Sequence, residues 1–218
     1  MQSYTNKADT YFAHARKEIA PLLPADCGRV LELGCGSGAT LAWLRQVRRV
    51  AYTAGVEISE TAAKAARQDV DEVHCADIER TEVFFSGGRF DLVLCLDVLE
   101  HLVDPWAMVD RLVTQQLAAG GTLIVSVPNI RHFSVLVPLL FQGRWDYTDA
   151  GHLDRTHLRF FTRHSALQLL THPRLTKPVC RDTGFVGWSR KNLLNTLTLG
   201  LFRDFVTYQY YLVARERS

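Results

Sequence analysis

A glycine-rich turn constrains this chain more than any other feature of its sequence. The apolar segment Arg29–Leu33 runs directly into Gly34-Cys-Gly36-Ser-Gly38, and a helical spacing of apolar residues follows. Glycine adopts positive φ readily and lets a bound molecule approach backbone N–H groups, so the pattern predicts a strand, a ligand-binding turn and a helix. Gly34, Gly36 and Ala39 also fit the dinucleotide pattern G-x-G-x-x-G/A. A tight turn that binds nothing is the simpler alternative.

Strand-like and helix-like segments alternate from Arg29 to Val127. Repeated strand–helix–strand units with short links predict an α/β fold, in which helices cover both faces of a parallel sheet. The expected strands are Arg29–Leu33, Val50–Glu57, Val73–Ala76, Phe90–Leu96 and Thr122–Val127. The expected helices are Thr40–Val47, a helix capped by Ser59 and running to Gln68, and Pro105–Leu117.

Further elements flank this alternating region. Ahead of it, a helix is expected at about Asp9–Leu23, where apolar residues share one side. For the apolar stretches Phe133–Phe141 and Leu193–Val206, core packing is the favoured interpretation over an apolar cover of the site, a dimer face or a lipid-facing surface. The remaining expected elements are a helix capped by Thr162 and ending near Leu170, a strand near Val179–Trp188, an amphipathic stretch Leu193–Val206 and a last strand Thr207–Ala214.

Composition excludes several classes of protein. The chain has 218 residues, of which 47% are apolar, and its net charge is +2, so it is neither disordered nor an evident nucleic-acid binder. No apolar run approaches the roughly 20 residues of a membrane-spanning helix, and the N-terminus lacks a signal-peptide pattern. The five cysteines form no CxxC motif. A cytoplasmic location is the expectation.

Carboxylates stand at the ends of three expected strands. These residues are Glu57, Asp77 and Asp97. Ligands of open parallel sheets bind outside the carboxyl ends of the strands, where a carboxylate can accept from both hydroxyls of a ribose or from the amine of a purine. Ordinary strand-end charges are the alternative. With the glycine turn, the pattern favours a ligand that contains a nucleoside.

Five linked motifs resemble the class I S-adenosylmethionine-dependent methyltransferases. They are E-L-G-C-G-S-G, G-V-E-I-S, C-A-D-I-E, F-D-L-V-L-C-L-D-V-L-E-H and L-A-A-G-G-T-L-I-V-S-V-P-N, and they span Val30–Asn129 in the family's order. Further motifs resemble a bacterial subfamily often found with surface-polysaccharide genes. These begin at Tyr11, Gly143 and Gly151.

The resemblance implies a Rossmann-like sheet of seven strands in the order 3-2-1-4-5-7-6, with the last strand antiparallel. Its sixth strand would lie near Phe185. A single domain would comprise a helical cap (1–28), a cofactor-binding half (29–129) and an acceptor-side segment with the closing strands (130–218). The implied cofactor is S-adenosyl-L-methionine, with S-adenosyl-L-homocysteine as product. The implied cofactor residues are Glu32, Gly34, Cys35, Gly36, Gly38, Glu57, Ile58, Asp77, Ile78, Leu96, Asp97 and Val98.

Transfer to a sugar or other hydroxyl oxygen gains from a base, and histidine suits that task near neutral pH. The candidate bases are His101, then His157, then His152, with Asp149 or Asp154 as an orienting partner. His101 could instead hydrogen-bond a neighbouring loop or the tail of the cofactor. For acceptor contacts we name Tyr11, Trp145, Tyr147 and Arg159, although core aromatics and a loop-stapling arginine are open alternatives.

No metal ion is expected. The segment His152-x-Asp154-x-x-His157 lacks the i, i+4 helical spacing, and no clustered carboxylates offer the oxygens that magnesium prefers. The expected partner is a small-molecule or glycan acceptor, with no nucleic acid, and a homodimer through the apolar stretches is open.

Three other functions are weighed. An N-methyltransferase is less favoured, because Val127-Pro-Asn-Ile130 replaces the N-P-P-Y-type motif of many amino-group methylases. An NAD(P)-dependent oxidoreductase leaves Gly38, Asp77 and the D-V-L-E-H segment unexplained, and Tyr-x-x-x-Lys is absent. A non-catalytic cofactor-binding module is the third.

Overall fold

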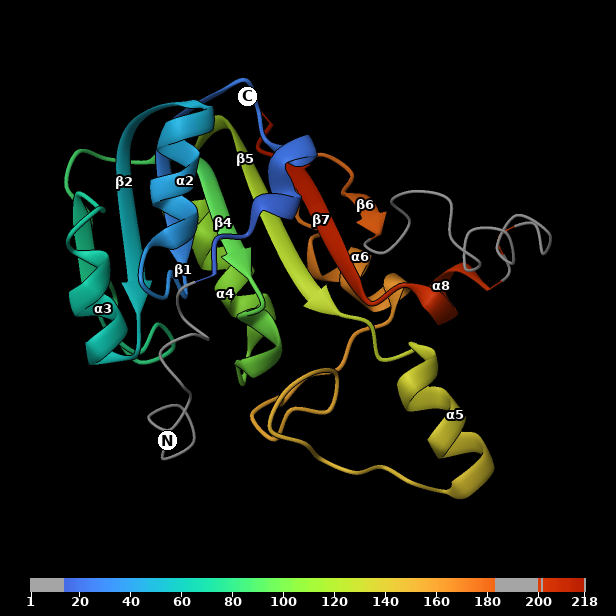
Figure 1. Ribbon diagram of the computed structural model, residues 1–218. Helices are drawn as coiled ribbons and strands as arrows, with labels where there is room; N and C mark the ends of the chain where they lie inside the picture. The colour runs from blue at the N-terminus through green and yellow to red at the C-terminus, as the bar shows by residue number, and fades with distance from the viewer. Residues whose placement is uncertain (1–13, 183–199, 201, 218) are drawn as a thin grey trace.

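Seven strands form one sheet in the computed structural model, which describes residues 14–182, 200 and 202–217 (Figure 1). The order is β3-β2-β1-β4-β5-β7-β6; β7 is antiparallel to β5 and β6, and the other pairs are parallel. The predicted α/β fold and strand order are therefore confirmed. The strands are β1 (Asp26–Leu33), β2 (Arg49–Glu57), β3 (Glu72–Cys75), β4 (Phe90–Leu96), β5 (Leu117–Pro128), β6 (Val179–Asp182) and β7 (Gln209–Arg215).

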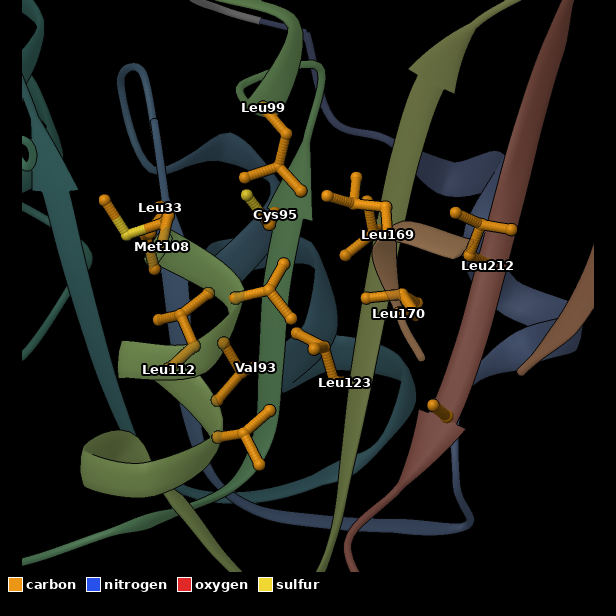
Figure 2. Packing of buried hydrophobic residues seen from close by; sticks show 14 of the residues in the cluster. Leu33, Val93, Cys95, Leu99, Met108, Leu112, Leu123, Leu169, Leu170 and Leu212 are labelled. Atoms are coloured by element: carbon orange, nitrogen blue, oxygen red, sulfur yellow. The ribbon is translucent and has the colours of Figure 1, made fainter. Parts of the chain in front are cut away.

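Helices cover both faces of the sheet, and each face has its own apolar cluster. Leu41 of α2 and Ala66 of α3 pack on one face, and Met108 of α4 and Leu169 of α6 on the other (Figure 2). The continuous apolar strand β4 is buried on both sides, as its composition predicts. The helical elements are η2 (Lys17–Leu22), α2 (Ala39–Val47), α3 (Glu60–Ala66), η3 (Leu99–His101), α4 (Pro105–Arg111), η4 (Leu112–Gln116), α5 (Phe133–Gln142), α6 (Arg163–Leu169) and α8 (Arg203–Val206).

The predicted N-terminal helix Asp9–Leu23 is wrong in its described part. Residues 14–16 are not helical, and η2 is a short 3₁₀ helix over Lys17–Leu22 that contains Pro21. Proline lacks the N–H group and clashes with the carbonyl four residues earlier, so an α-helix cannot run through this position undisturbed.

The connection between α4 and β5 differs from the prediction. The α-helix ends at Arg111, a π-helical turn η4 follows, and β5 starts at Leu117 instead of Thr122. The pairing of β4 with β5 shifts register between Phe90 and Leu92, and Gly120 adopts φ +72°. Gly120 and Gly121 therefore lie within an irregular part of β5, and the strand begins before them instead of after them.

The favoured interpretation of Phe133–Phe141 as core is wrong. The stretch forms α5, which lies outside the layers that cover the sheet (Figure 1), and Val135 is its one buried residue. Leu140 is 71% exposed and Phe141 81%. The His132 side chain caps the start of α5 by accepting from Ser134 N, and Gly143 ends the helix in the left-handed conformation. Burial of its apolar residues would need a facing element as well.

The last strand lies close to its predicted position, since β7 covers Gln209–Arg215 where Thr207–Ala214 was expected. β6 covers Val179–Asp182, and Phe185, expected within strand six, lies outside the described residues. Most of Leu193–Val206 also lies outside them, apart from Gly200 and the residues from Phe202 onward. Across the described part of the chain, no helix has the length and apolar character needed to cross a membrane.

Candidate active site

The glycine turn lies between the end of β1 and the start of α2. Gly34 and Gly36 adopt φ of +66° and +54°, and Gly34 N donates to Val56 O over 2.8 Å. A Cβ atom on Gly34 would lie 2.6 Å from Val98 Cγ2. Glycine is therefore required at position 34 for both the backbone conformation and the close approach to Val98.

Glu57 is held at the end of β2 by backbone donors. Gly36 N donates to its Oε2 over 2.9 Å, and Ser59 N donates to its Oε1 over 2.8 Å. The side chain is 5% exposed. This carboxylate thus joins the glycine turn to the start of α3 and faces the ligand side with a fixed orientation.

A cavity of about 850 Å³ opens at the carboxyl ends of β1, β2 and β4. Its volume is within the range of small-molecule sites. All predicted cofactor residues except Gly38 line it, namely Glu32, Gly34, Cys35, Gly36, Glu57, Ile58, Asp77, Ile78, Leu96, Asp97 and Val98. Gly38 begins α2 instead, and a Cβ there would lie 2.8 Å from Val70 Cγ2.

Glu32 is a buried acid on the cavity wall. It is 3% exposed, and burial raises its pKa to about 8, although a hydrogen bond from Thr40 acts in the opposite direction. Its Oε2 atom has no hydrogen-bond partner within the described residues. A carboxylate in this state favours either a proton or a cationic group of a ligand.

Asp77 also lines the cavity and follows the end of β3. Its Oδ1 accepts from Glu79 N over 3.0 Å, and Arg80 forms an ion pair with it at 3.5 Å. Ile78 also lines the cavity, and Ile58, 44% exposed, does the same from the end of β2.

Asp97 forms a polar network that the sequence analysis missed. Arg16 Nη1 donates to Asp97 Oδ2 over 2.6 Å, and Ser126 Oγ and Gln209 Nε2 donate to Oδ1. Asp97 adopts φ +56°, which is unusual for a residue with a side chain. Arg16 also lines the cavity, and its one sequence signal is its place in the motif that begins at Tyr11.

The three predicted histidines have different surroundings. His101 lines the cavity, and its Nδ1 lies 3.1 Å from Thr156 O. His157 is not part of the lining, but its ring packs edge-on against His101 with centroids 4.7 Å apart. His152 is directed elsewhere, because its Nε2 lies 2.9 Å from Tyr208 O and its ring stacks on His132.

The expected orienting carboxylates have other partners. Asp149 pairs with Arg155 at 3.0 Å, and Asp154 Oδ1 accepts from both N and Oγ1 of Thr156. Asp154 therefore shapes the loop that carries Thr156 and His157.

Comparisons with known proteins agree with this geometry. A family model described as a methyltransferase domain matches residues 4–172. A ubiquinone biosynthesis O-methyltransferase of Psychrobacter arcticus is 30% identical over 169 residues, which cover 68% of this chain and 64% of that protein. The family is decided by these matches together with the fold. The chain is a class I S-adenosylmethionine-dependent methyltransferase.

Solved structures share the fold of this methyltransferase. An S-adenosylmethionine-dependent methyltransferase from Archaeoglobus fulgidus superposes with a TM-score of 0.64 at 17% identity, covering 99% of this chain and 97% of that one. The N-methyltransferase NodS from Bradyrhizobium japonicum, in complex with S-adenosyl-L-homocysteine, has a TM-score of 0.54 at 18% identity, covering 96% and 86%. The chain spans between a third and two thirds of the first curated relatives it matches.

The methyltransferase's own residues fit the cofactor of its family. Glu32 has a buried oxygen without a donor among the described residues, Gly34 and Gly36 have no side chains where the turn lines the cavity, and Glu57 stands at the end of β2. The buried carboxylate suits the ammonium group of the methionine moiety, and the exposed backbone of the turn suits the methionine chain packed against it. The strand-end carboxylate suits a ribose.

Three of the predicted acceptor contacts, Trp145, Tyr147 and Arg159, do not line the cavity of the methyltransferase. Trp145 packs edge-on against Phe160, Tyr147 is 46% exposed, and Arg159 donates to Val103 O. Tyr11 lies outside the described residues. Other residues that the sequence analysis did not name do line the cavity, namely His14, Val103, Arg155, Thr156 and Leu158.

Proposed function

We propose that this methyltransferase transfers the methyl group of S-adenosylmethionine to a hydroxyl oxygen of a small molecule, with His101 as the base. The observation that carries the proposal is the position of His101 on the cavity wall, with Nδ1 against Thr156 O. A carbonyl only accepts, so Nδ1 carries the proton and Nε2 of the neutral ring carries the basic lone pair. Proton transfer to Nε2 needs no metal ion.

We assign roles to the cofactor residues that were predicted from the family resemblance and that line the cavity. The cofactor supplies an electrophilic methyl group on a sulfonium, so the protein has to bind, orient and exclude water. We assign Glu32 to the amino end of the methionine moiety and Glu57 to the ribose hydroxyls. Asp77 and Ile78 meet the adenine edge, while Ile58 covers one adenine face. Cys35 and the turn from Gly34 to Gly38 pack against the methionine chain.

We add Arg16 to the cofactor residues. Its guanidinium lies on the cavity wall beside Asp97 and acts electrostatically on Glu32. A guanidinium suits the carboxylate of the methionine moiety, because its fork matches the two oxygens of a carboxylate.

The acceptor enters on the side formed by residues that follow Asn129. Arg155, Thr156 and Leu158 line the cavity there, and Thr156 O lies 3.1 Å from His101 Nδ1. This supports the division into a cofactor-binding half (29–129) and an acceptor-side segment (130–218). The similarity to ubiquinone biosynthesis O-methyltransferases supports a small organic acceptor, and sugar hydroxyls belong to the same chemical class.

A transfer assay tests the proposal. The full chain is incubated with methyl-labelled S-adenosylmethionine and separate panels of phenols, sugars, nucleotide sugars and amines. Transfer to a hydroxyl acceptor is expected, and His101→Gln should lower kcat by about 100- to 10,000-fold, as the loss of a general base does. His164→Gln is the control, because His164 is exposed on α6.

Three results contradict the proposal. Transfer to amines alone identifies an N-methyltransferase. Tight binding of NADH without binding of S-adenosylmethionine identifies an oxidoreductase site. Full turnover by His101→Gln on a hydroxyl acceptor removes the base assignment.

A further inference from the structure

We propose that Glu100, His101 and His157 form a binding site for a divalent transition-metal ion of the zinc type, beside the acceptor end of the cavity. The three residues come from η3 and from the loop before α6. One ligand atom from each lies within 4.8 Å of the other two. Small side-chain rotations bring such a set to the distances of about 2.0–2.2 Å that zinc makes with histidine nitrogen and carboxylate oxygen.

Both histidines are set in the tautomer that a metal ligand needs. His101 Nδ1 lies 3.1 Å from Thr156 O, and His157 Nδ1 lies 3.1 Å from His152 O. Each carbonyl accepts a proton from Nδ1, so each Nε2 has the lone pair in the neutral ring. Metal-bound histidines commonly donate their other nitrogen to a backbone carbonyl or a carboxylate in this way.

Glu100 supplies an independent observation. Its side chain is 1% exposed, and neither carboxylate oxygen has a hydrogen-bond partner within the described part of the chain. A buried carboxylate without donors is costly unless a proton or a cation accompanies it. Because this carboxylate is close to two imidazole nitrogens, a cation bound by all three groups satisfies it.

The backbone holds the two segments together. Leu158 N and Arg159 N both donate to Glu100 O, over 2.8 and 2.9 Å. These bonds fix the loop of His157 against η3 without using any of the three side chains. His152 is not a member of the set, because its Nε2 is engaged by Tyr208 O.

The donor set indicates the class of metal. Two imidazoles and one carboxylate suit Zn²⁺, Fe²⁺ or Co²⁺, whereas Mg²⁺ prefers oxygen ligands. Three protein ligands leave at least one coordination position open, as in catalytic zinc sites. His101 lines the cavity, so an acceptor oxygen can reach that position.

The role of the ion rests on the proposed function, whereas its binding does not. With the ion bound, His101 Nε2 is a ligand, and an acceptor hydroxyl on the open position loses its proton to water because the ion stabilises the oxyanion. Without the ion, His101 accepts that proton itself. The hydroxyl is activated at the same place in both cases.

Metal binding to the full chain tests the inference directly. Chelator-treated protein is titrated with Zn²⁺ by calorimetry and with Co²⁺ by visible absorption. We expect one ion per chain and a cobalt spectrum of low coordination number. Glu100→Gln and His157→Ala should each weaken binding by at least about 100-fold, more than the loss of an outer partner usually does. Circular dichroism of each metal-free variant checks its fold.

Two control variants remove alternative ligands. His164→Ala and Cys75→Ser remove an exposed imidazole and an exposed thiol, and binding should not change. Binding that is equally tight in Glu100→Gln and His157→Ala overturns the site, as does the absence of stoichiometric binding. A protein that binds no ion and still methylates hydroxyls overturns this inference and leaves the proposed function intact. A protein that binds the ion without hydroxyl transfer supports the site and contradicts the proposed function.

Discussion

Arg16 donates from Nη1 to Asp97 Oδ2 over 2.6 Å, although 81 positions separate the two residues. Arg16 precedes η2, and Asp97 follows the inner strand β4. The ion pair therefore ties the N-terminal segment to the carboxyl end of β4. Tyr211 of β7 lies 2.9 Å from Arg16 Nη2 and adds a third element. We therefore expect the contacts of Arg16 with Asp97 and Tyr211 to hold the N-terminal residues that line the cavity.

Arg16→Ala should destabilise the protein and weaken its binding of the cofactor. The side chains of Arg16 and Asp97 are 17% and 31% exposed, so removal of the guanidinium leaves a partly buried carboxylate without its cation. We expect a loss of about 1–3 kcal/mol in unfolding free energy, measured in urea. Affinity for S-adenosyl-L-homocysteine should fall about tenfold or more by calorimetry.

The matched control is Arg49→Ala. Arg49 pairs with Asp26 at 3.9 Å, and their side chains are 88% and 62% exposed. Exposed pairs of this kind contribute little, so a change below about 0.5 kcal/mol is expected. Equal losses in both variants would show that the Arg16–Asp97 pair has no special role.

Gly34→Ala should weaken cofactor binding by more than its loss of stability explains. A Cβ at position 34 would lie 2.6 Å from Val98 Cγ2, so Val98 must move within the cavity wall. Gly143→Ala shares the backbone cost, since φ is +63° there against +66°, but its Cβ would meet nothing within 4 Å. Both variants should lose about 1–2 kcal/mol of stability from the left-handed conformation. Calorimetry should show weaker S-adenosyl-L-homocysteine binding in Gly34→Ala alone.

Glu57→Gln should weaken cofactor binding. The two carboxylate oxygens accept from Gly36 N and Ser59 N, and an amide can accept at only one of these positions. One backbone N–H is left without an acceptor at a cost of about 1–3 kcal/mol, and the ribose loses an acceptor as well. We expect at least about tenfold weaker binding of S-adenosyl-L-homocysteine. Glu60→Gln, on the exposed side of α3, is the control and should bind normally.

Stability should fall with rising pH because of Glu32. Burial raises the pKa of Glu32 from 4.5 to about 8 in the folded chain. Between these values the folded protein keeps a proton that the unfolded chain has lost. The contribution is fully present below pH 4.5 and is lost as the pH rises through about 8.

Glu32→Gln isolates this effect, since glutamine resembles the protonated acid and does not titrate. The unfolding free energy of the unaltered chain should fall relative to Glu32→Gln by up to about 1.4 kcal/mol per pH unit between pH 5 and 8. Urea unfolding at several pH values measures the difference. Parallel pH curves for the two proteins would contradict a raised pKa.

The sheet could be predicted well from local patterns. The apolar run Phe90–Leu96 became β4 with the same bounds, and Ser59 caps α3 through a bond from Ala62 N, as its position before the helix predicts. Helix starts, the glycine turn and the run of a fully buried strand depend on backbone conformation and on neighbours in sequence. The order of strands required the family resemblance as well.

The exposure of α5 could not be predicted from local sequence patterns. An apolar helix such as Phe133–Gln142 has the same sequence pattern whether or not another element covers it. Leu140 and Phe141 are exposed because no layer of the described fold lies over them, which is a property of the assembled chain.

The sequence by itself determined the buried strand β4, the glycine turn and the strand-end carboxylates Glu57, Asp77 and Asp97, since these follow from short-range periodicity and turn chemistry. The order of the seven strands and the roles proposed for the cofactor residues came from the family resemblance. Tertiary structure decided which histidine meets the cavity. The two bonds to Glu100 O bring the loop of Thr156 and His157 to His101, while Tyr208 O turns His152 away. It also brought Arg16 to Asp97. These contacts join distant segments through single hydrogen bonds, and residue spacing carries no signal for them.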